Sequence, residues 1–487
     1  MQQVDSSTPT NLTILELPEL LKRLFKRVQR PLRTAFGSEA GLFLRYLCHK
    51  PDKGLVALYK IDGHDDGAAG SFACLIVDES AFQGRVISFS MQQVEQEPIE
   101  VTEAGVLRLP TLGITAQLFP IDEGLPTLAD CCDTGPGSRL CRQLEGAAGE
   151  FLNDPAWQIS EVHARPMRYK PGSHCVICYQ LQLRHAFEEE TRPLTLFGKV
   201  YADERRAHAV QASQFLIYAE QMHIGVIPPM LPQPSGQPED LRLVISEALQ
   251  GESLCPGTRA LQAHVEYGDK GGIRCVVLPV ERLKRTATAL AIIHQSDTLT
   301  GKQTLHTGSK EAKKVLERAR LLAEYYPAFA HEITTLAERL SKLLYLAQPE
   351  RYGLAHGNFK PSQILFTGEA IAVVDFDSVC LADPALDIGY FLAYLRPPQL
   401  WHGRSGMRSW FEGAEQTFCD TYRQALELFD EDSAAIENVF ARARLYTAAL
   451  IFKIATRRVH RLNSPRPQEL KAMLSEIQMC MPPEKIY

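Results

Sequence analysis

Several features are missing from this 487-residue chain, and each absence excludes a class of protein. No run approaches the ~20 apolar residues of a membrane-spanning helix. The longest candidate, Leu445–Phe452, is closed by Arg444 and Lys453. The first residues lack a basic stretch followed by an apolar core, so no export signal is predicted. The net charge of −6 offers no overall field that would attract nucleic acid or an anionic membrane.

The 12 cysteines form no short disulfide framework, so we expect reduced thiols and a cytoplasmic location. Cys175 and Cys178 have redox or zinc spacing, but no second pair follows them. Their side chains would point to opposite faces of a strand, so we interpret both as packing residues. With 45% hydrophobic and 23% charged residues, the chain is typical of a globular protein.

The pattern of apolar residues changes along the chain and predicts an α+β fold. Alternating apolar residues predict strands in the first half, and helical spacing dominates the second half. We expect an N-terminal α+β module at 1–150, a strand-rich lobe at 151–250 and a helical lobe at 251–487, interrupted only between Gly353 and Asp377. The expected strands are 54–59, 72–77, 85–89, 175–183, 194–201 and 241–246, and the expected helices are 15–28, 138–152, 204–222, 283–294, 315–322, 333–346, 411–429 and 434–460.

Two segments resemble each other within the chain. Lys50-Pro-Asp-Lys-Gly-Leu-Val-Ala-Leu-Tyr59 and Lys170-Pro-Gly-Ser-His-Cys-Val-Ile-Cys-Tyr179 share the pattern KP-x4-V-x2-Y, and an Arg-Tyr pair precedes each. The N-terminal module is therefore either a decayed copy of the following strand-rich lobe or a region that shares a turn with it by chance. Both alternatives stay open from the sequence alone.

The strongest chemical signal lies between residues 356 and 387. It consists of His356-Gly-Asn-Phe-Lys-Pro-Ser-Gln-Ile-Leu365, then Ile371-Ala-Val-Val-Asp-Phe-Asp377, then Ala382-Asp-Pro-Ala-Leu-Asp387. Polar groups flank two short apolar strands, so they converge at one end of a small hairpin. Such a hairpin suits a site that holds a cation together with a phosphate.

This pattern resembles the aminoglycoside phosphotransferase and choline-kinase-like family, whose segments read roughly H-G-D-x4-N, D-F-D and G-D-P-x2-D. The resemblance implies a two-lobed protein-kinase-like fold, with a small antiparallel-sheet lobe and a larger helical lobe, here preceded by the extra strand-rich module. It extends over about residues 160–455. It implies ATP and Mg²⁺ as cofactors and a small-molecule hydroxyl as the phosphate acceptor.

The same resemblance assigns roles to individual residues. Gly172 would lie in the hairpin over the nucleotide, and Lys199 would hold its α- and β-phosphates. Glu247, in the segment 246–251, would belong to the hinge beneath adenine. Lys360 would reach the γ-phosphate, and Gln363 and Asp375 would bind the metal. The acidic partner that kinases provide for the lysine is not assignable here, with Glu204 too close in sequence and Glu220 a guess.

The chain departs from the family at the residue that matters most for catalysis. Asn358 stands where the family has its catalytic Asp, and an amide cannot take a proton at neutral pH. General-base catalysis is worth about 10²–10⁴-fold, so we expect slow transfer unless another group, such as Asp377, substitutes. Gln363 stands where the family has Asn, and its amide oxygen can still bind Mg²⁺. Asp387 is expected to hold the loop backbone, and His356 and His294 to be structural.

Two hypotheses follow. The first is an ATP- and Mg²⁺-dependent small-molecule kinase whose activity is in doubt because of Asn358. The second is a pseudokinase that binds nucleotide or serves as a scaffold, with the N-terminal module as the surface for a protein partner. The sequence gives no identity for the acceptor. The basic stretch at Arg457–Arg461 ends a predicted helix, and we interpret it as a helix-end feature and not as a nucleic-acid site.

Overall fold

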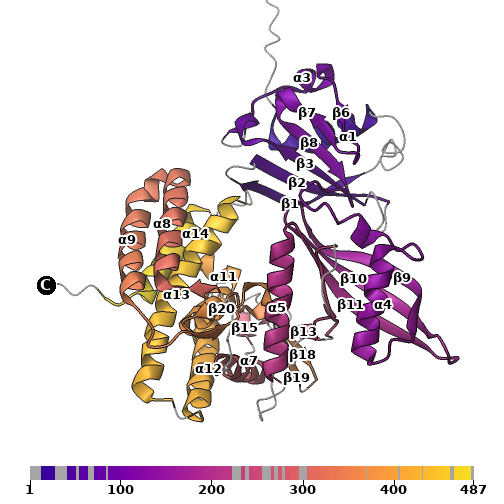
Figure 1. Cartoon of the computed structure of the whole chain (residues 1–487). Helices are drawn as coiled ribbons and strands as arrows, with labels where there is room; N and C mark the ends of the chain where they lie inside the picture. Colours follow the sequence, from indigo (N-terminus) through magenta and orange to yellow (C-terminus); the bar gives the residue numbers. More distant parts are fainter. Residues whose placement is uncertain are drawn as a thin grey trace, which may run out of the picture. The chain divides into compact units, whose positions relative to one another are not determined.

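The computed structural model divides the chain into two compact units, which are described separately (Figure 1). Unit 1 holds residues 1–211, 234–248 and 460–462, and unit 2 holds 212–233, 249–459 and 463–487. One division between them falls between Ala248 and Leu249, within the segment predicted as a hinge. The structure describes residues 12–27, 41–50, 54–63, 71–83, 86–221, 232–235, 241–249, 251–254, 265–267, 273–276, 280–295, 304–368, 370–403, 406–429, 431–460 and 466–483.

Unit 1 contains two antiparallel sheets. The first has six strands in the order β1-β2-β3-β8-β7-β6, and the second has four in the order β12-β11-β10-β9. The strands of the first sheet are β1 (Leu42–Lys50), β2 (Gly54–Ile61), β3 (Phe72–Val77), β6 (Glu100–Val101), β7 (Leu107–Leu109) and β8 (Ile114–Leu118). Two short strands, β4 (Phe82–Gln83) and β5 (Val86–Ile87), form a separate antiparallel pair. The strands of the second sheet are β9 (Trp157–Lys170), β10 (His174–His185), β11 (Thr191–Tyr201) and β12 (Leu243–Glu247). The helices are α1 (Leu17–Lys26), α3 (Met91–Gln96), α4 (Arg139–Leu152) and α5 (Glu204–Gln221). Helix α5 begins in unit 1 and ends in unit 2.

Strand β2 is buried on both faces because its two sets of alternating side chains enter two different cores. Leu55, Ala57 and Tyr59 pack with the apolar face of helix α1. Val56 and Leu58 instead join the core that contains helix α4 and strands β9, β10 and β11. The two sheets of unit 1 are therefore joined through one shared hydrophobic core.

The two segments with the KP-x4-V-x2-Y pattern form equivalent hairpins. In the first, β1 pairs with β2 so that Lys50 lies opposite Gly54. In the second, β9 pairs with β10 so that Lys170 lies opposite His174. Each hairpin continues into a third antiparallel strand, β3 and β11 respectively. The sequence similarity therefore coincides with a similar strand arrangement.

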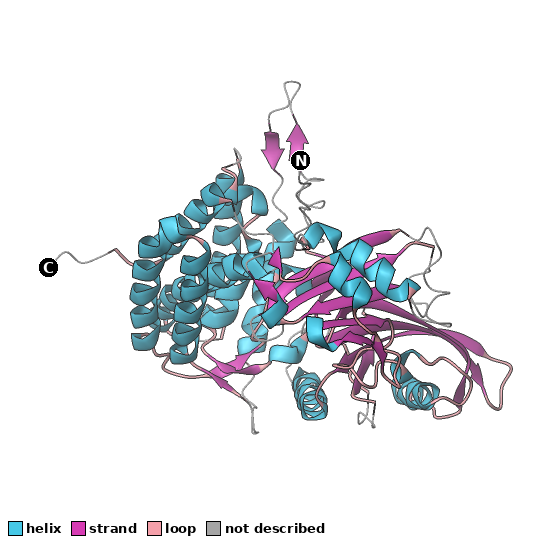
Figure 2. Cartoon of the chain, turned by 90° about the horizontal axis from the view of Figure 1, so that it is seen from above, coloured by secondary structure: helices cyan, strands magenta, loops and turns pink. Residues whose placement is uncertain are grey.

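Unit 2 is mainly helical, and its large core is built from long helices around a few short strands. Figure 2 draws the helices in cyan and the strands in magenta. The helices are α7 (Val280–His294), α8 (Gly308–Tyr325), α9 (Ala330–Leu346), α10 (Ala385–Leu395), α11 (Pro398–Trp401), α12 (Met407–Glu427), α13 (Ser433–His460) and α14 (Pro467–Cys480). The strands are β13 (Glu252–Ser253), β14 (Val265–Tyr267), β15 (Ile273–Val276), β16 (Leu305–His306), β17 (Gly353–Ala355), β18 (Ile364–Thr367), β19 (Ala370–Val373) and β20 (Cys380–Ala382).

The described elements confirm the predicted α+β class, with antiparallel sheets first and helices after. Most predicted strands and helices are present within a few residues of their expected bounds. The expectation that only Gly353–Asp377 interrupts the helical region is wrong, because the short pairs β14–β15 and β16–β20 lie outside it. Strands of two to four residues are too short to show a pattern of alternation.

Candidate functional site

The loop after strand β17 is held in place by hydrogen bonds to its backbone. The backbone N–H of His356 donates to Oδ2 of Asp387 over 2.6 Å, and Nε2 of His356 bonds the carbonyl oxygen of Val374 over 3.1 Å. Gly357 has φ +72°, and a Cβ there would lie 2.0 Å from the carbonyl oxygen of Ser378. Only glycine fits this position, so the turn that carries Asn358 has one tightly defined path.

Asp387 belongs to a fully buried polar network. Its Oδ2 atom lies 3.4 Å from Nε2 of His294, and Nδ1 of His294 lies 2.6 Å from the hydroxyl of Tyr422. His294 and Asp387 are buried, and so is Tyr422. The contacts fit the predicted structural role of Asp387. His294 lies in the core as expected, but as part of a network that reaches the loop backbone.

A second buried carboxylate follows the same pattern. Asp383 is fully buried and accepts hydrogen bonds from Nε of Arg442 over 2.6 Å and from the backbone of Ala385 over 3.1 Å. Arg442 lies on α13, 59 residues away in sequence. This pair fixes the start of α10 against α13, and no sequence pattern predicted it.

Gln363 and Asp375 lie side by side at the end of the hairpin formed by β18 and β19. Nε2 of Gln363 donates to Oδ2 of Asp375 over 2.7 Å. Oε1 of Gln363 is buried and has no hydrogen-bond partner among the described residues. Asp375 has φ +69°, a left-handed conformation that is uncommon for a residue other than glycine and is often found at functional sites.

This pair fits the ligand chemistry of Mg²⁺. Carboxylate and amide oxygens are hard ligands of the kind that Mg²⁺ prefers, and it is commonly bound by one or two carboxylates together with substrate phosphates. The unpartnered Oε1 atom provides an oxygen for such an ion. No group of three or more His, Cys, Asp or Glu side chains suited to a metal occurs in the part of the chain that the structure describes. A metal here would therefore complete its coordination with phosphate oxygens and water.

The other residues assigned to the loop lie nearby in the chain and are partly exposed. Asn358 is half-buried in the turn that Gly357 defines, and Asp377 is half-buried in the short 3-10 helix Phe376–Ser378. The ammonium group of Lys360 lies 5.2 Å from the centroid of the Tyr394 ring on α10. Asn358, Lys360, Gln363 and Asp375 thus all belong to unit 2.

Lys199 lies in unit 1, on the central strand β11. It is half-buried and lies opposite Val176 on β10 and Val244 on β12. Its ammonium group lies 5.7 Å from the centroid of the Tyr201 ring, on the sheet face against which α5 packs. Glu204 lies near His208 at 3.7 Å, and the side chain of Glu220 lies outside the described residues. The acidic partner of Lys199 stays unassigned.

Gly172 lies in the turn between β9 and β10 and has φ +61°. Its N–H donates to Oδ2 of Asp122 over 2.8 Å, and the hydroxyl of Tyr169 donates to the same oxygen over 2.8 Å. A Cβ on Gly124 would lie 2.5 Å from Cα of Gly172, so the two chains are in close contact. The sequence analysis missed Asp122 because it lies in the N-terminal module, outside the family resemblance.

Glu247 ends strand β12 and is exposed, opposite Leu196 in the ladder. Cys175 and Cys178 are free and buried, and burial raises the pKa of both thiols. This agrees with their interpretation as packing residues. The arginines that we interpreted as a helix-end feature bond other helices instead: Arg457 donates to the Tyr394 hydroxyl over 2.8 Å, and Arg458 lies 2.6 Å from Glu469.

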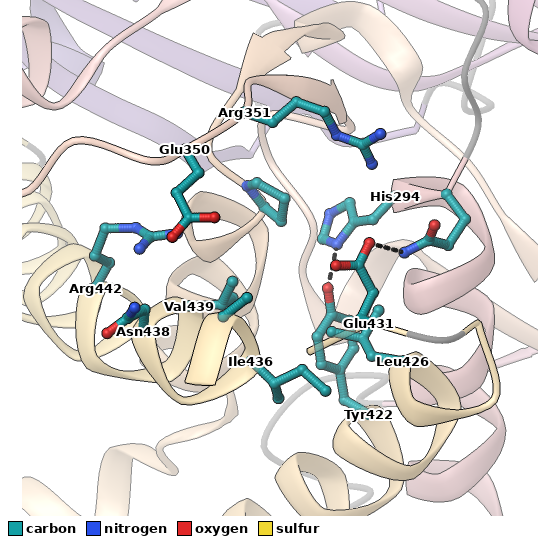
Figure 3. A pocket seen from close by; sticks show the side chains of 13 residues that line it. His294, Glu350, Arg351, Tyr422, Leu426, Glu431, Ile436, Asn438, Val439 and Arg442 are labelled. Carbon is teal, nitrogen blue, oxygen red and sulfur yellow. Dashed lines mark hydrogen bonds between the residues drawn. The ribbon is translucent and has the colours of Figure 1, made fainter. Parts of the chain in front are cut away.

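A cavity of about 100 Å³ opens beside the buried network of His294 (Figure 3). Figure 3 shows His294, Tyr422 and Glu431 along one part of its wall and Glu350 and Arg442 along another. The lining therefore includes residues that hold the loop and the start of α10. No helix among the described residues is long and apolar enough to cross a membrane.

Comparison with known proteins gave one family match and a set of solved structures. The family described as "Phosphotransferase enzyme family" matches residues 277–435. This segment contains Asn358, Lys360, Gln363, Asp375 and Asp387, and it excludes Lys199, Gly172 and Glu247. A comparison with curated proteins gave no match.

The solved structures are distant in sequence. A glucosamine kinase in complex with glucosamine, ADP and inorganic phosphate is 15% identical, with 95% of this chain and 99% of that chain covered and a TM-score of 0.44. An ethanolamine kinase from Plasmodium vivax is 11% identical, with coverage of 75% and 96% and a TM-score of 0.41. A spectinomycin phosphotransferase in complex with ADP and spectinomycin is 12% identical, with coverage of 67% and 91% and a TM-score of 0.39.

The family match is independent of these structural similarities and covers the segment in which the His356–Asp387 motifs occur. Residues 277–435 therefore match the family described as "Phosphotransferase enzyme family", in agreement with the resemblance of those motifs.

Proposed function

We propose that this protein is a small-molecule kinase that binds ATP and Mg²⁺ and transfers the γ-phosphoryl group to a hydroxyl, slowly because of Asn358. Gln363 and Asp375 would hold the metal, and Lys199 and Lys360 would contact the phosphates. Gly172 and Glu247 would line the nucleotide site. The acceptor is a small molecule whose identity the residues above do not specify.

The observation that carries this proposal is the pairing of Gln363 with Asp375. A buried amide oxygen without a hydrogen-bond partner among the described residues costs free energy, about 1–3 kcal/mol for a group of this kind. Such a cost is typical of a site that gains its partner on binding. The neighbouring carboxylate, 2.7 Å from the amide nitrogen, makes a cation the partner that best fits.

The residues of the chain would act by positioning and by charge. The bonds from His356 to Asp387 and Val374 fix the loop, so Asn358 presents its amide at a defined place. The amide oxygen can accept a hydrogen bond from the acceptor hydroxyl and orient it, but the proton must leave to solvent or another base. A bound Mg²⁺ would neutralise phosphate charge. Preorganised groups of this kind supply much of the catalysis in phosphoryl transfer.

Asn358 also favours a second candidate, a pseudokinase that binds nucleotide without transferring phosphate. In this alternative the N-terminal module would serve a protein partner. The two candidates share the nucleotide site and differ only in chemistry, so they make different predictions for one substitution.

Two measurements test the proposal. Isothermal titration of the full chain with Mg-ATP should show binding, and the Asp375→Asn variant should lose it, with Asp377→Asn as a control in the same 3-10 region. Absence of Mg-ATP binding by the wild type would refute both candidates. A phosphate-transfer assay over a panel of small hydroxyl compounds then compares the wild type with Asn358→Asp.

The result of that comparison separates the candidates. Slow transfer in the wild type with a gain of about 10²-fold or more in Asn358→Asp supports a kinase limited by its missing base. Binding of Mg-ATP without transfer in either protein, over the whole panel, supports the pseudokinase. Faster transfer in the wild type than in the variant would contradict the argument that Asn358 limits the reaction.

A further inference from the structure

A group of cationic side chains lies on two tyrosines of helix α10, close to the loop that carries Lys360. The rings of Tyr390 and Tyr394 are stacked, with centroids 6.3 Å apart and an angle of 11° between their planes. Lys453 donates a hydrogen bond to the Tyr390 hydroxyl, and its ammonium lies 4.6 Å from the centroid of that ring. We call Lys360, Lys453 and Arg457, with the two tyrosines, the cationic cluster.

Lys453 and Arg457 differ from most buried or half-buried arginines of unit 2 in the groups to which they are hydrogen-bonded. Arg318, Arg396 and Arg442 each bond a buried carboxylate. Within the described residues, Lys453 and Arg457 bond tyrosine hydroxyls instead, and neither has a carboxylate within ion-pair distance. A buried cation is normally paired, so Lys453 without such a pair is held uncharged near neutral pH, and a bound anion would favour its charged form.

Glu311, the carboxylate whose charge acts on Lys453, already has cationic partners of its own. Glu311 on α8 is buried and already contacts Arg318 at 2.6 Å, Lys314 at 3.4 Å and His306 at 3.2 Å. Burial, together with the charges of Arg457, Arg318 and Lys360, lowers the pKa of Lys453 to about 6 against an opposing effect of Glu311. The surroundings of Lys453 are therefore net positive, and an added anion would be attracted there.

The cluster is open to a ligand. Arg457 is exposed, and Lys360, Lys453 and Tyr394 are half-buried. Lys360 connects the cluster to the loop of the proposed site, because its ammonium lies over the Tyr394 ring whose hydroxyl Arg457 contacts. Two ammonium groups and a guanidinium on a fixed aromatic platform suit an oxyanion, which accepts several charged hydrogen bonds at once.

We propose that the cationic cluster binds an oxyanion, a carboxylate or phosphate monoester, carried by the acceptor substrate. This rests on the proposed function, because an acceptor is meaningful only if the protein is a kinase. The acceptor would then be an anionic hydroxyl compound, held by Lys453 and Arg457 with its hydroxyl towards the loop. The phosphates of the nucleotide are the other source of the same chemistry.

Inorganic phosphate is the probe for the cluster itself. Isothermal titration of the full chain should show phosphate binding, and Lys453→Met and Arg457→Gln should each weaken it about tenfold or more, since hydrogen bonds to charged groups contribute about 1.5–3 kcal/mol. Lys471→Met, at an exposed lysine of α14, is the matched control and should bind as the wild type does. Arg457→Gln alters an exposed side chain, so it keeps the test valid if Lys453→Met folds poorly.

Titration with Mg-ATP distinguishes the two sources of the anion. The acceptor site is supported if Lys453→Met binds Mg-ATP with unchanged affinity and if the wild type binds phosphate and Mg-ATP at the same time. Competition between phosphate and Mg-ATP, with both weakened in Lys453→Met, would show that the nucleotide provides the anion and would overturn the acceptor assignment. Equal phosphate affinity in the wild type, Lys453→Met and Arg457→Gln, or none in any of them, would overturn the site.

The Asp375→Asn variant separates this inference from the proposed function. Loss of Mg-ATP binding in that variant with intact phosphate binding shows that the two sites are independent, and both proposals stand. If the wild type binds phosphate at the cluster but never binds Mg-ATP, the kinase proposal fails and the acceptor assignment fails with it, while the anion site remains.

Discussion

Replacing Lys453 with methionine should stabilise the protein, and the gain should shrink as the pH rises. Lys453 lies in the buried part of α13, directly after the apolar run Leu445–Phe452, and its pKa in the folded protein is about 6. In the unfolded chain a lysine titrates near its ordinary value of 10.5. Methionine has a similar length and no charge, so it fills the same space.

The sign follows from the protons bound in each state. Between the two pKa values the unfolded chain binds a proton at Lys453 that the folded protein does not, so the free energy of unfolding rises with pH. The residue lowers stability by about 6 kcal/mol below pH 6, by about 4 kcal/mol at pH 7.5 and by about 2 kcal/mol at pH 9. Burial is the largest cause of this pKa shift, followed by the charges of Arg457 on α13, Arg318 and Glu311 on α8, and Lys360 in the loop.

The substitution also removes a hydrogen bond and leaves the Tyr390 hydroxyl without that partner, at a cost of about 1 kcal/mol. The net gain expected from Lys453→Met is therefore about 3 kcal/mol at pH 7.5 and about 1 kcal/mol at pH 9. The difference of about 2 kcal/mol between the two pH values does not depend on the lost hydrogen bond.

This difference is measured by urea unfolding of the full-length wild type and the Lys453→Met variant at pH 7.5 and pH 9. The unfolding transition of unit 2 is the one that is followed. Lys471→Met should show no such dependence on pH, because its side chain is exposed in the folded protein. A gain that is equal at pH 7.5 and pH 9, or a loss of stability at both, would refute the reasoning that Lys453 is held uncharged by burial and by its cationic neighbours.

Three further substitutions test the loop and its supports. Arg442→Ala should destabilise unit 2 by about 3–5 kcal/mol in urea unfolding, because it leaves the carboxylate of Asp383 buried without its cation, and Arg442→Lys should recover part of the loss. Gly357→Ala should cost more than the ~1–2 kcal/mol of a left-handed residue, because its Cβ would meet the carbonyl oxygen of Ser378 at 2.0 Å, and an unchanged unfolding midpoint would contradict the described turn. Asp122→Ala should weaken Mg-ATP binding in a titration, because the turn at Gly172 loses its acceptor, and unchanged affinity would argue against a nucleotide beneath that turn.

The sequence predicted those parts of the fold whose signals are local. The strand β10 pairs with β11 over eleven positions and is rich in apolar residues, which alternate with polar ones from Tyr179 to Arg184. The helix α7 repeats apolar residues on one face. The motif between His356 and Asp387 predicted the contact of Asp387 with the loop backbone, which the structure has at 2.6 Å. Each of these patterns lies within one short stretch of chain.

The contacts that the sequence could not predict join residues far apart in the chain. Asp383 and Arg442 are 59 residues apart, and Lys453 and Tyr390 are 63 residues apart. Asp122 and Gly172 are 50 residues apart. A buried lysine and a surface lysine look alike in a sequence, because burial is decided by which helices pack together and not by the residues next to it.

The double burial of strand β2 has a practical consequence for anyone who wishes to express a shorter fragment of the chain. A gene fragment that starts at codon 151 would remove the partners of β10 and β11 in their shared core, among them Val56, Leu58 and Leu144. The freshly uncovered apolar surface would favour aggregation over folding. The first 150 residues therefore cannot be trimmed as a dispensable extension, and designs of shorter variants should keep them.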